Sequence, residues 1–510
     1  MNMFHVLQAR IKSMARRESG PVKLLGVIEI TLGIALLAPA VIALIYGEDP
    51  VAFICPVPVL LVLGTLQYIF FKSGETMKPA SGMLMIFAAW WITFFVSMIP
   101  FCLYGLSPID SFFEAVSGFT TTGISVMGDA SIPRSIIFWG AFTQWAGGIA
   151  IILIFLFLIP MMGIGGRAFV NNELAGSSSY NFTMRIKSAV MNFMLTYVIL
   201  SVLEAVLLTA SGLAPFEAVT MMFSTISTGG FMASGNSMAD YSFITQAVVV
   251  VFMFLGGTNF YLHYRAVNKR EFSAYKTSQE FIWTVIWFVT ATALIAAVIL
   301  MNAGDISSVN IGGTLWDSLF TVVSFGTTTG YSVSDNLTLP FAAYIILWMV
   351  MLFGSMSGST SGGIKIYRLL ILKSYVTNGI YRMLHPRSVR DVRMDGHSVS
   401  NDTVVSAMAV VVMFAAALIA SVFFLLVSEP GMSISESIGL SISVISNSGM
   451  NLGTVTYHEL SGLTKIFLAF MMWVGRLEVV MALLIFTRAF WSDLILDIKG
   501  SRYAEKNRKG

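Results

Sequence analysis

The chain has 510 residues, of which 56% are hydrophobic and 11% are charged, and its mean hydropathy is +0.80. This composition excludes an ordinary soluble protein and leaves little material for a large water-exposed domain, so we predict a polytopic membrane protein. The net charge of +3 does not indicate a nucleic-acid partner, because the basic residues lie between apolar runs. Cys55 and Cys102 offer neither a disulfide framework nor a metal-ligand spacing.

Ten apolar runs reach the length of about 20 residues that a membrane helix needs. The predicted spans are 22–46, 51–71, 81–104, 134–161, 185–211, 242–264, 281–302, 340–374, 402–428 and 463–491. The first two form a hairpin, and the other eight form four pairs that each enclose a short polar loop. We therefore predict an all-α polytopic membrane protein with four pseudo-fourfold span–pore-loop–span repeats and an accessory N-terminal two-helix hairpin.

The predicted boundaries follow from these pairs. They are 1–78 for the N-terminal segment and hairpin, 79–175 for repeat 1 with its filter loop at 110–125, 176–276 for repeat 2 with its filter loop at 214–231, 277–395 for repeat 3 with its filter loop at 314–331, and 396–510 for repeat 4 with its filter loop at 433–450 and the tail. If the ten spans alternate, the basic segments 10–17, 72–78, 167–187, 265–276, 368–393 and 499–509 share one side. The positive-inside bias then predicts that both termini are cytoplasmic and that the four loops face outward.

The four loops are related to one another in sequence. They read Thr120-Thr121-Thr122-Gly123-Ile124, Ile226-Ser227-Thr228-Gly229-Gly230, Thr327-Thr328-Thr329-Gly330-Tyr331 and Ser446-Asn447-Ser448-Gly449-Met450. A short helical segment led by an acidic residue precedes each loop. A single loop of this kind is equally typical of an external turn. Four in corresponding places favour a cation filter, because hydroxyl-bearing residues before a glycine allow several backbone carbonyls to face one axis.

Two features inside predicted spans break the rules for membrane helices. The first is a run of ten small or polar residues at 354–363 in repeat 3, which includes Gly354, Ser357, Gly358, Ser359, Gly362 and Gly363 and is followed by Lys365. Such residues weaken helices, so we predict an intramembrane loop; close packing of small residues is the alternative. The second is Arg476, whose burial in a span costs roughly 2.5–3.5 kcal/mol. It is expected to face a pore, or else to pair with Glu478 or a carbonyl.

Together the four loops, with their glycines at Gly123, Gly229, Gly330 and Gly449, resemble the Trk/Ktr/HKT superfamily of potassium transporters. The N-terminal hairpin is similar to that of the bacterial TrkH/TrkG branch. This resemblance implies that potassium is coordinated by the carbonyls of Thr121 and Thr122, Ser227 and Thr228, Thr328 and Thr329, and Asn447 and Ser448. It also implies that the 354–363 loop with Lys365 and Arg476 form a gate below the filter.

The resemblance further implies a setting in the bacterial inner membrane, a homodimer, and a cytoplasmic ring of the TrkA type that binds NAD(H) or ATP. No other cofactor is expected, K⁺ is the substrate ion, and the chain is not expected to be an enzyme. The expected function is potassium-selective uptake by channel-like permeation; a sodium-permeable or proton- or sodium-coupled symporter is the alternative. His263, His385 and His397 are predicted to be solvated, and we assign no role to Glu204.

Overall fold

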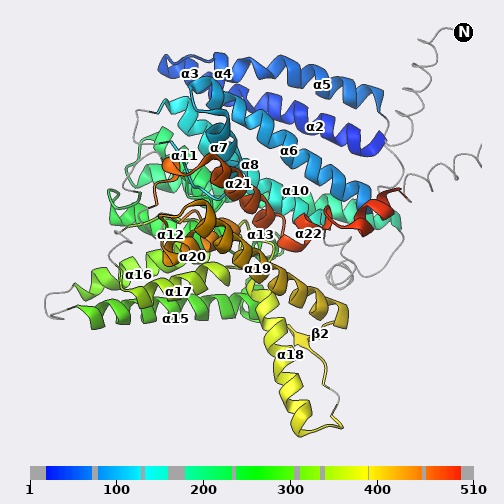
Figure 1. The fold of residues 1–510 in the computed structure, drawn as a ribbon, viewed down its shortest axis with the longest axis vertical. Helices are drawn as coiled ribbons and strands as arrows, with labels where there is room; N and C mark the ends of the chain where they lie inside the picture. The colour runs from blue at the N-terminus through cyan, green and yellow to red at the C-terminus, as the bar shows by residue number, and fades with distance from the viewer. Residues whose placement is uncertain are drawn as a thin grey trace, which may run out of the picture. The chain divides into compact units, whose positions relative to one another are not determined.

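The computed structural model describes residues 19–71, 79–127, 132–158, 179–232, 237–303, 310–333, 339–388, 390–450 and 455–495, without the side chains of 19–21, 79, 154–158 and 179–189. These residues are mostly helical, as predicted (Figure 1). The single sheet within them pairs the two-residue strands β1 (Arg393–Met394) and β2 (His397–Ser398). Three of the six basic segments that predict the orientation (10–17, 72–78 and 499–509), and residue 167 of a fourth, lie outside the described residues.

Contacts divide the chain into two compact units. One contains the described parts of Met1–Ala115, Pro133–Trp139 and Met481–Gly510, and the other contains those of Val116–Ile132 and Gly140–Val480. Each unit is described here by itself. All the predicted filter residues and the predicted gate residues belong to the second unit, which begins at Val116 in the first filter loop.

The first unit contains the predicted N-terminal hairpin. The hairpin consists of α2 (Ser19–Ala35), α3 (Leu37–Tyr46), α4 (Val51–Ile54) and α5 (Pro56–Phe70), and the next helix, α6 (Pro79–Tyr104), is the first span of repeat 1. Helices α2 and α5 lie side by side (Figure 1). They cross where a Cβ added to Gly64 would lie 2.6 Å from the Gly26 carbonyl oxygen, and one added to Gly26 would lie 2.7 Å from that of Gly64. Small residues at both positions allow this close backbone approach, which is how membrane helices commonly associate.

The other helices of the four repeats follow α6 in chain order. They are α7 (Pro108–Phe119) and α8 (Arg134–Leu158); α10 (Ser179–Ala210), α11 (Pro215–Ile226), α12 (Phe243–Gly256), α13 (Phe260–Asn268) and α14 (Ser273–Thr277); α15 (Gln279–Asn302), α16 (Ile311–Gly326), α17 (Phe341–Leu352) and α18 (Ile366–Leu384); and α19 (Asn401–Ser428), α20 (Ile434–Ile445), η3 (Tyr457–Glu459), α21 (Gly462–Arg476) and α22 (Val479–Leu484). Helices α15, α16 and α17 pack together, and α18 projects away from them (Figure 1).

Seven of the ten predicted spans are long apolar helices in the described residues. The other three are not continuous, which corrects the prediction. The span predicted at 242–264 is α12 and α13, bent by 100° at Gly256–Phe260, where the Asn259 side chain caps α13. The span predicted at 340–374 is interrupted after α17, and that at 463–491 ends as a helix at Arg476. The first two breaks bond to each other, because the N–H groups of Thr360 and Met356 donate to the carbonyls of Gly256 and Gly257, as buried irregular backbone requires.

Candidate functional site: a ring of four re-entrant segments

The four short helices α7, α11, α16 and α20 end in the same way. The next residue in each copy carries a hydroxyl that donates to the carbonyl four residues earlier. The bonds are Thr120 to Val116 at 2.7 Å, Ser227 to Phe223 at 2.7 Å, Thr327 to Val323 at 2.8 Å, and Ser446 to Ile442 at 2.6 Å. These hydroxyls are therefore used to terminate the helices.

The two residues that follow have an unusual backbone. The first has a left-handed φ in every copy: 52° at Thr121, 55° at Thr228, 58° at Thr328 and 56° at Asn447. This conformation is rare for β-branched residues and marks a functional or strained segment. The N–H of the second donates to the helix carbonyl five residues earlier: Thr122 to Ser117 at 2.9 Å, Gly229 to Ser224 at 2.8 Å, Thr329 to Ser324 at 2.7 Å, and Ser448 to Ser443 at 2.8 Å. The chain thus turns back on itself identically four times.

This geometry corrects the register of the second copy. The glycine with positive φ is Gly123, Gly330 and Gly449 in three copies, but Gly230 rather than Gly229 in the other. Gly229 corresponds to Thr122, and Ser227 corresponds to the helix-terminating Thr120. The second copy has two adjacent glycines, Gly229 and Gly230, and the predicted register uses the first of them. The sequence contains a signal for the correct register. A serine lies six residues before each glycine of positive φ, at Ser117, Ser224, Ser324 and Ser443.

The four segments contact one another in a closed ring. A Cβ added to Gly123, Gly230, Gly330 or Gly449 would lie closer than 3.0 Å to the carbonyl oxygen of Gly229, Thr329, Ser448 or Thr122, respectively. Each glycine therefore touches the carbonyl of the next copy, and the fourth copy returns to the first. Only glycine fits, because its φ is positive and a side chain would overlap backbone that cannot give way. The structure brings all four predicted segments together.

The predicted intramembrane loop is present between α17 and α18, and it packs against this ring. The Thr360 hydroxyl donates to the carbonyls of Ile226 (3.2 Å) and Gly256 (3.0 Å), and the Thr228 hydroxyl donates to it at 3.2 Å. The Gly362 N–H donates to the Thr328 hydroxyl at 2.9 Å, and a Cβ at Gly362 would overlap the Ser446 carbonyl. The loop thus contacts the second, third and fourth copies at the residues just after their helices.

The rest of the loop bonds within itself and to α13 and α15. The Ser357 N–H donates to the Glu280 carboxylate at 2.6 Å, and the Gly358 carbonyl accepts from the Phe260 N–H at 3.1 Å. The Ser359 hydroxyl donates to the Met356 carbonyl at 2.6 Å, and the Lys365 ammonium to the Ser361 carbonyl. Gly354 and Gly363 face each other across the neck of the loop, where their α-carbons approach closely.

Arg476 is buried beside the loop. Its Nη1 donates to the Thr360 carbonyl at 2.7 Å, whereas Nε and Nη2 have no hydrogen-bond partner among the described residues. Of the alternatives for this residue, the structure contains the carbonyl contact. Glu478 instead pairs with Arg368, with Nη2 and Oε2 at 2.5 Å. All eight predicted gate residues therefore lie in or against one loop.

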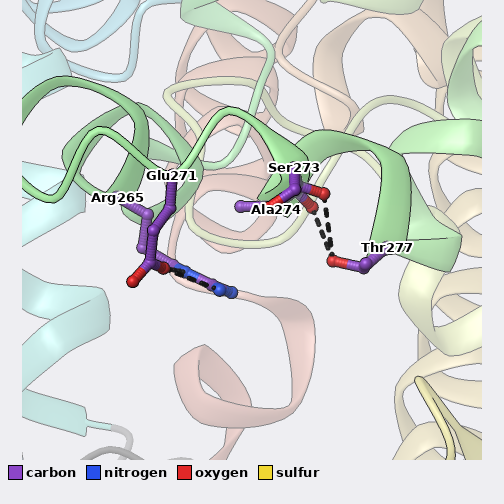
Figure 2. Close-up of polar contacts among 5 residues, drawn as sticks. All are labelled: Arg265, Glu271, Ser273, Ala274 and Thr277. Atoms are coloured by element: carbon purple, nitrogen blue, oxygen red, sulfur yellow. Dashed lines mark hydrogen bonds and ion pairs between the residues drawn. The ribbon is translucent and has the colours of Figure 1, made fainter.

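His263 is not solvated, contrary to the prediction. It is 3% exposed, and its ring nitrogens lie 2.8 Å from the Tyr275 hydroxyl and 2.9 Å from the Leu255 carbonyl. The bend between α12 and α13 folds α13 onto α14, which covers the imidazole. The linker beyond it is polar: Arg265 pairs with Glu271 at 2.9 Å, and the Thr277 hydroxyl faces the carbonyls of Ser273 and Ala274 (Figure 2).

Several acidic side chains have structural partners. The Glu48 carboxylate caps α8 by accepting from the N–H groups of Arg134 and Ser135, and Glu436 forms a capping box with Ser433. Near the loop before α12, burial raises the pKa of the Tyr241 hydroxyl, and the negative charges of Glu217 and Asp240 raise it further. Two carboxylates, Glu217 in the first turn of α11 and Asp240, therefore act on the same hydroxyl.

A multi-pass helical protein in which four re-entrant segments close into one ring belongs to the class of four-repeat, pore-loop membrane proteins. A model of the TrkH family, described as cation transport protein, matches residues 63–497, so the chain belongs to this family. The chain is therefore a multi-pass membrane transport protein rather than an enzyme.

Individual relatives agree with this assignment. The chain is 27% identical over 486 residues to the Trk system potassium uptake protein TrkH of Vibrio parahaemolyticus, covering 92% of this chain and 98% of that one. It is 27% identical to TrkG of Escherichia coli, covering 90% and 95%. The crystal structure of the potassium transporter TrkH from Vibrio parahaemolyticus has a TM-score of 0.84 and 26% identity, covering 93% of this chain and 99% of that one.

Proposed function

We propose that this chain mediates potassium-selective uptake by channel-like permeation through the ring of four re-entrant segments. The observation that supports this most is the closure of the ring, glycine against carbonyl, in all four copies. Among the described residues, the carbonyls of Thr122, Thr329 and Ser448 accept no hydrogen bond, so their lone pairs are free to replace the water around a cation. The names of the relatives, as potassium uptake proteins, favour potassium as the substrate ion.

Uptake through such a ring needs no coupled ion. A membrane potential of about 150 mV, inside negative, supplies roughly 3.5 kcal/mol per charge. At 1.36 kcal/mol per tenfold, this is enough for an accumulation of a few hundredfold. The negative groups near α11 would concentrate cations before entry.

The gate in this proposal is the 354–363 loop held by Arg476. The loop bonds to the second and third ring segments through Thr360 and Gly362, and the buried guanidinium bonds to the Thr360 carbonyl. A positive charge below the ring opposes a cation leaving it. Movement of the loop would break these few bonds together.

The proposed setting is the bacterial inner membrane, with both termini in the cytoplasm and with two copies of the chain above a TrkA-type regulatory ring. Nucleotide, as NAD(H) or ATP, would act only through that partner. Glu280 and Phe260 link the loop to α13 and α15, on the side predicted to be cytoplasmic, and so offer a mechanical route for such control.

The proposal is tested by complementing a bacterial strain that lacks its own potassium uptake. Wild type is expected to restore growth at low potassium, and Gly330→Ser is expected not to, because a side chain there would overlap the Ser448 carbonyl. Gly431→Ser is the matched control, since a Cβ at Gly431 meets nothing within 4 Å. Equal growth of the Gly330→Ser and wild-type strains, at equal protein levels, would refute the filter assignment.

The rival function, a sodium-permeable or proton- or sodium-coupled symporter, is separated by ⁸⁶Rb⁺ uptake into vesicles. Permeation driven by potential alone supports the proposal. Uptake that requires an imposed proton or sodium gradient at constant potential supports the symporter.

A further inference from the structure

Gln144 of α8 lies at the junction between the first and second ring segments. Its side chain is fully buried. The Nε2 donates to the Gly229 carbonyl at 2.7 Å, and the Oε1 accepts from the Phe231 N–H at 3.1 Å. These partners fix the orientation of the amide. If it were flipped, the Oε1 would face the Gly229 carbonyl oxygen and the Nε2 would face the Phe231 N–H, so that two acceptors and two donors would oppose each other. Gln144 therefore holds the backbone on both sides of Gly230.

This bond makes the second copy different from the others. Of the four corresponding carbonyls, only that of Gly229 accepts a hydrogen bond among the described residues. Gly229 is also the only one of the four residues without a side chain, and the space is filled by Gln144: a Cβ at Gly229 would lie 2.5 Å from its Cδ.

The other repeats have a methionine at the position that corresponds to Gln144. Gln144 lies three residues before Gly147 in repeat 1. The corresponding residues in the other repeats are Met253, Met351 and Met472, three residues before Gly256, Gly354 and Gly475. All three methionines are buried, and the Met351 Sδ lies 3.0 Å from the Ser448 Oγ. In the one such pair that the structure connects by a hydrogen bond, Met351 thus accompanies Ser448 in the ring, whereas Gln144 accompanies Gly229. The chain compensates a missing ring side chain with a polar one from the adjoining helix.

We propose that Gln144 is a positioning residue that determines cation discrimination in the ring, an inference that rests on the proposed potassium function. Its amide shares the Gly229 oxygen with the ion and fixes the distance of that oxygen from the axis. Without it, the oxygen would regain its full field strength and the segment its mobility. Both changes favour the smaller Na⁺ over K⁺.

The test compares Gln144→Met with Gln246→Met. Gln246 is the matched control, because its amide also donates to backbone carbonyls (Met238 at 3.0 Å and Tyr241 at 3.1 Å) but outside the ring. We expect Gln144→Met to lower the ratio of Rb⁺ to Na⁺ uptake about fivefold, the effect of one buried hydrogen bond. We expect Gln246→Met to leave it unchanged. Selective stabilisation of the purified protein by K⁺ over Na⁺, measured as a shift in Tm, should fall in parallel.

If Gln144→Met does not accumulate in the membrane, a rescue experiment tests the role of Gln144 instead. Gly229→Ser alone should abolish uptake, whereas Gln144→Met with Gly229→Ser recreates the Met351–Ser448 pair and should restore it. An unchanged selectivity ratio in Gln144→Met, or equal failure of the single and double variants, overturns the inference. Loss of growth with Gly330→Ser would then still support the ring as the potassium pathway, so the two failures are distinguishable.

Discussion

Replacing Gly230 by alanine tests the corrected register of the ring. The residue has a φ of +70°, and an added Cβ would overlap the Thr329 carbonyl of the next segment. Gly47 also has a φ of +70° but meets nothing within 4 Å, so Gly47→Ala isolates the conformational strain. That strain, about 1–2 kcal/mol, is common to both variants.

The overlap is specific to Gly230. Overpacking costs typically about 1–3 kcal/mol, which corresponds to a loss of roughly 5- to 150-fold in a rate or affinity. We therefore expect initial ⁸⁶Rb⁺ uptake by Gly230→Ala to be lower than that by Gly47→Ala by about this factor, at equal amounts of protein in the membrane. Equal uptake by the two variants would refute the assignment of Gly230 as a ring glycine.

Two further predictions concern the loop and the hairpin. Arg476→Met removes a charged bond to the Thr360 carbonyl, and because such bonds contribute about 1.5–3 kcal/mol, basal flux without any partner should rise about 10- to 150-fold. Arg265→Met, which breaks the partly exposed pair with Glu271 shown in Figure 2 and the contact of the guanidinium with the Tyr261 ring, should change basal flux little. Equal flux in the two variants would contradict the gate role. Gly64→Ala forces α2 and α5 apart and should lower the free energy of unfolding by about 1–3 kcal/mol with selectivity unchanged; an unaltered Tm of the purified protein would contradict the packing argument.

The four loops could be recognised in the sequence because each copy must satisfy the same local structural requirements. A helix must end, its terminal carbonyls need hydroxyl donors, and the returning strand needs a glycine. The interruption at 354–363 was visible for a similar reason, since ten small or polar residues cannot form a stable membrane helix. The N-terminal hairpin followed from the length of its apolar runs.

The bend at Gly256–Phe260 was missed because 242–264 is apolar enough throughout to pass as one span. The burial of His263 was missed for the same reason, as it depends on α13 folding back onto α14. Hydropathy depends only on the local composition of the chain. A break in a helix depends instead on neighbouring segments that can bond to the exposed backbone groups. Here the Gly256 and Gly257 carbonyls bond to Thr360 and Met356, about a hundred residues away in sequence.

The amino-acid sequence alone determined the class of the protein, the four-repeat plan and the segments that form the ring, because these depend on local composition and periodicity. Only the tertiary structure decided which glycine of the second copy enters the ring, which carbonyl Arg476 contacts and which carbonyl Gln144 contacts. These features depend on contacts between residues that are far apart in the sequence, and the order of residues along the chain does not reveal such contacts.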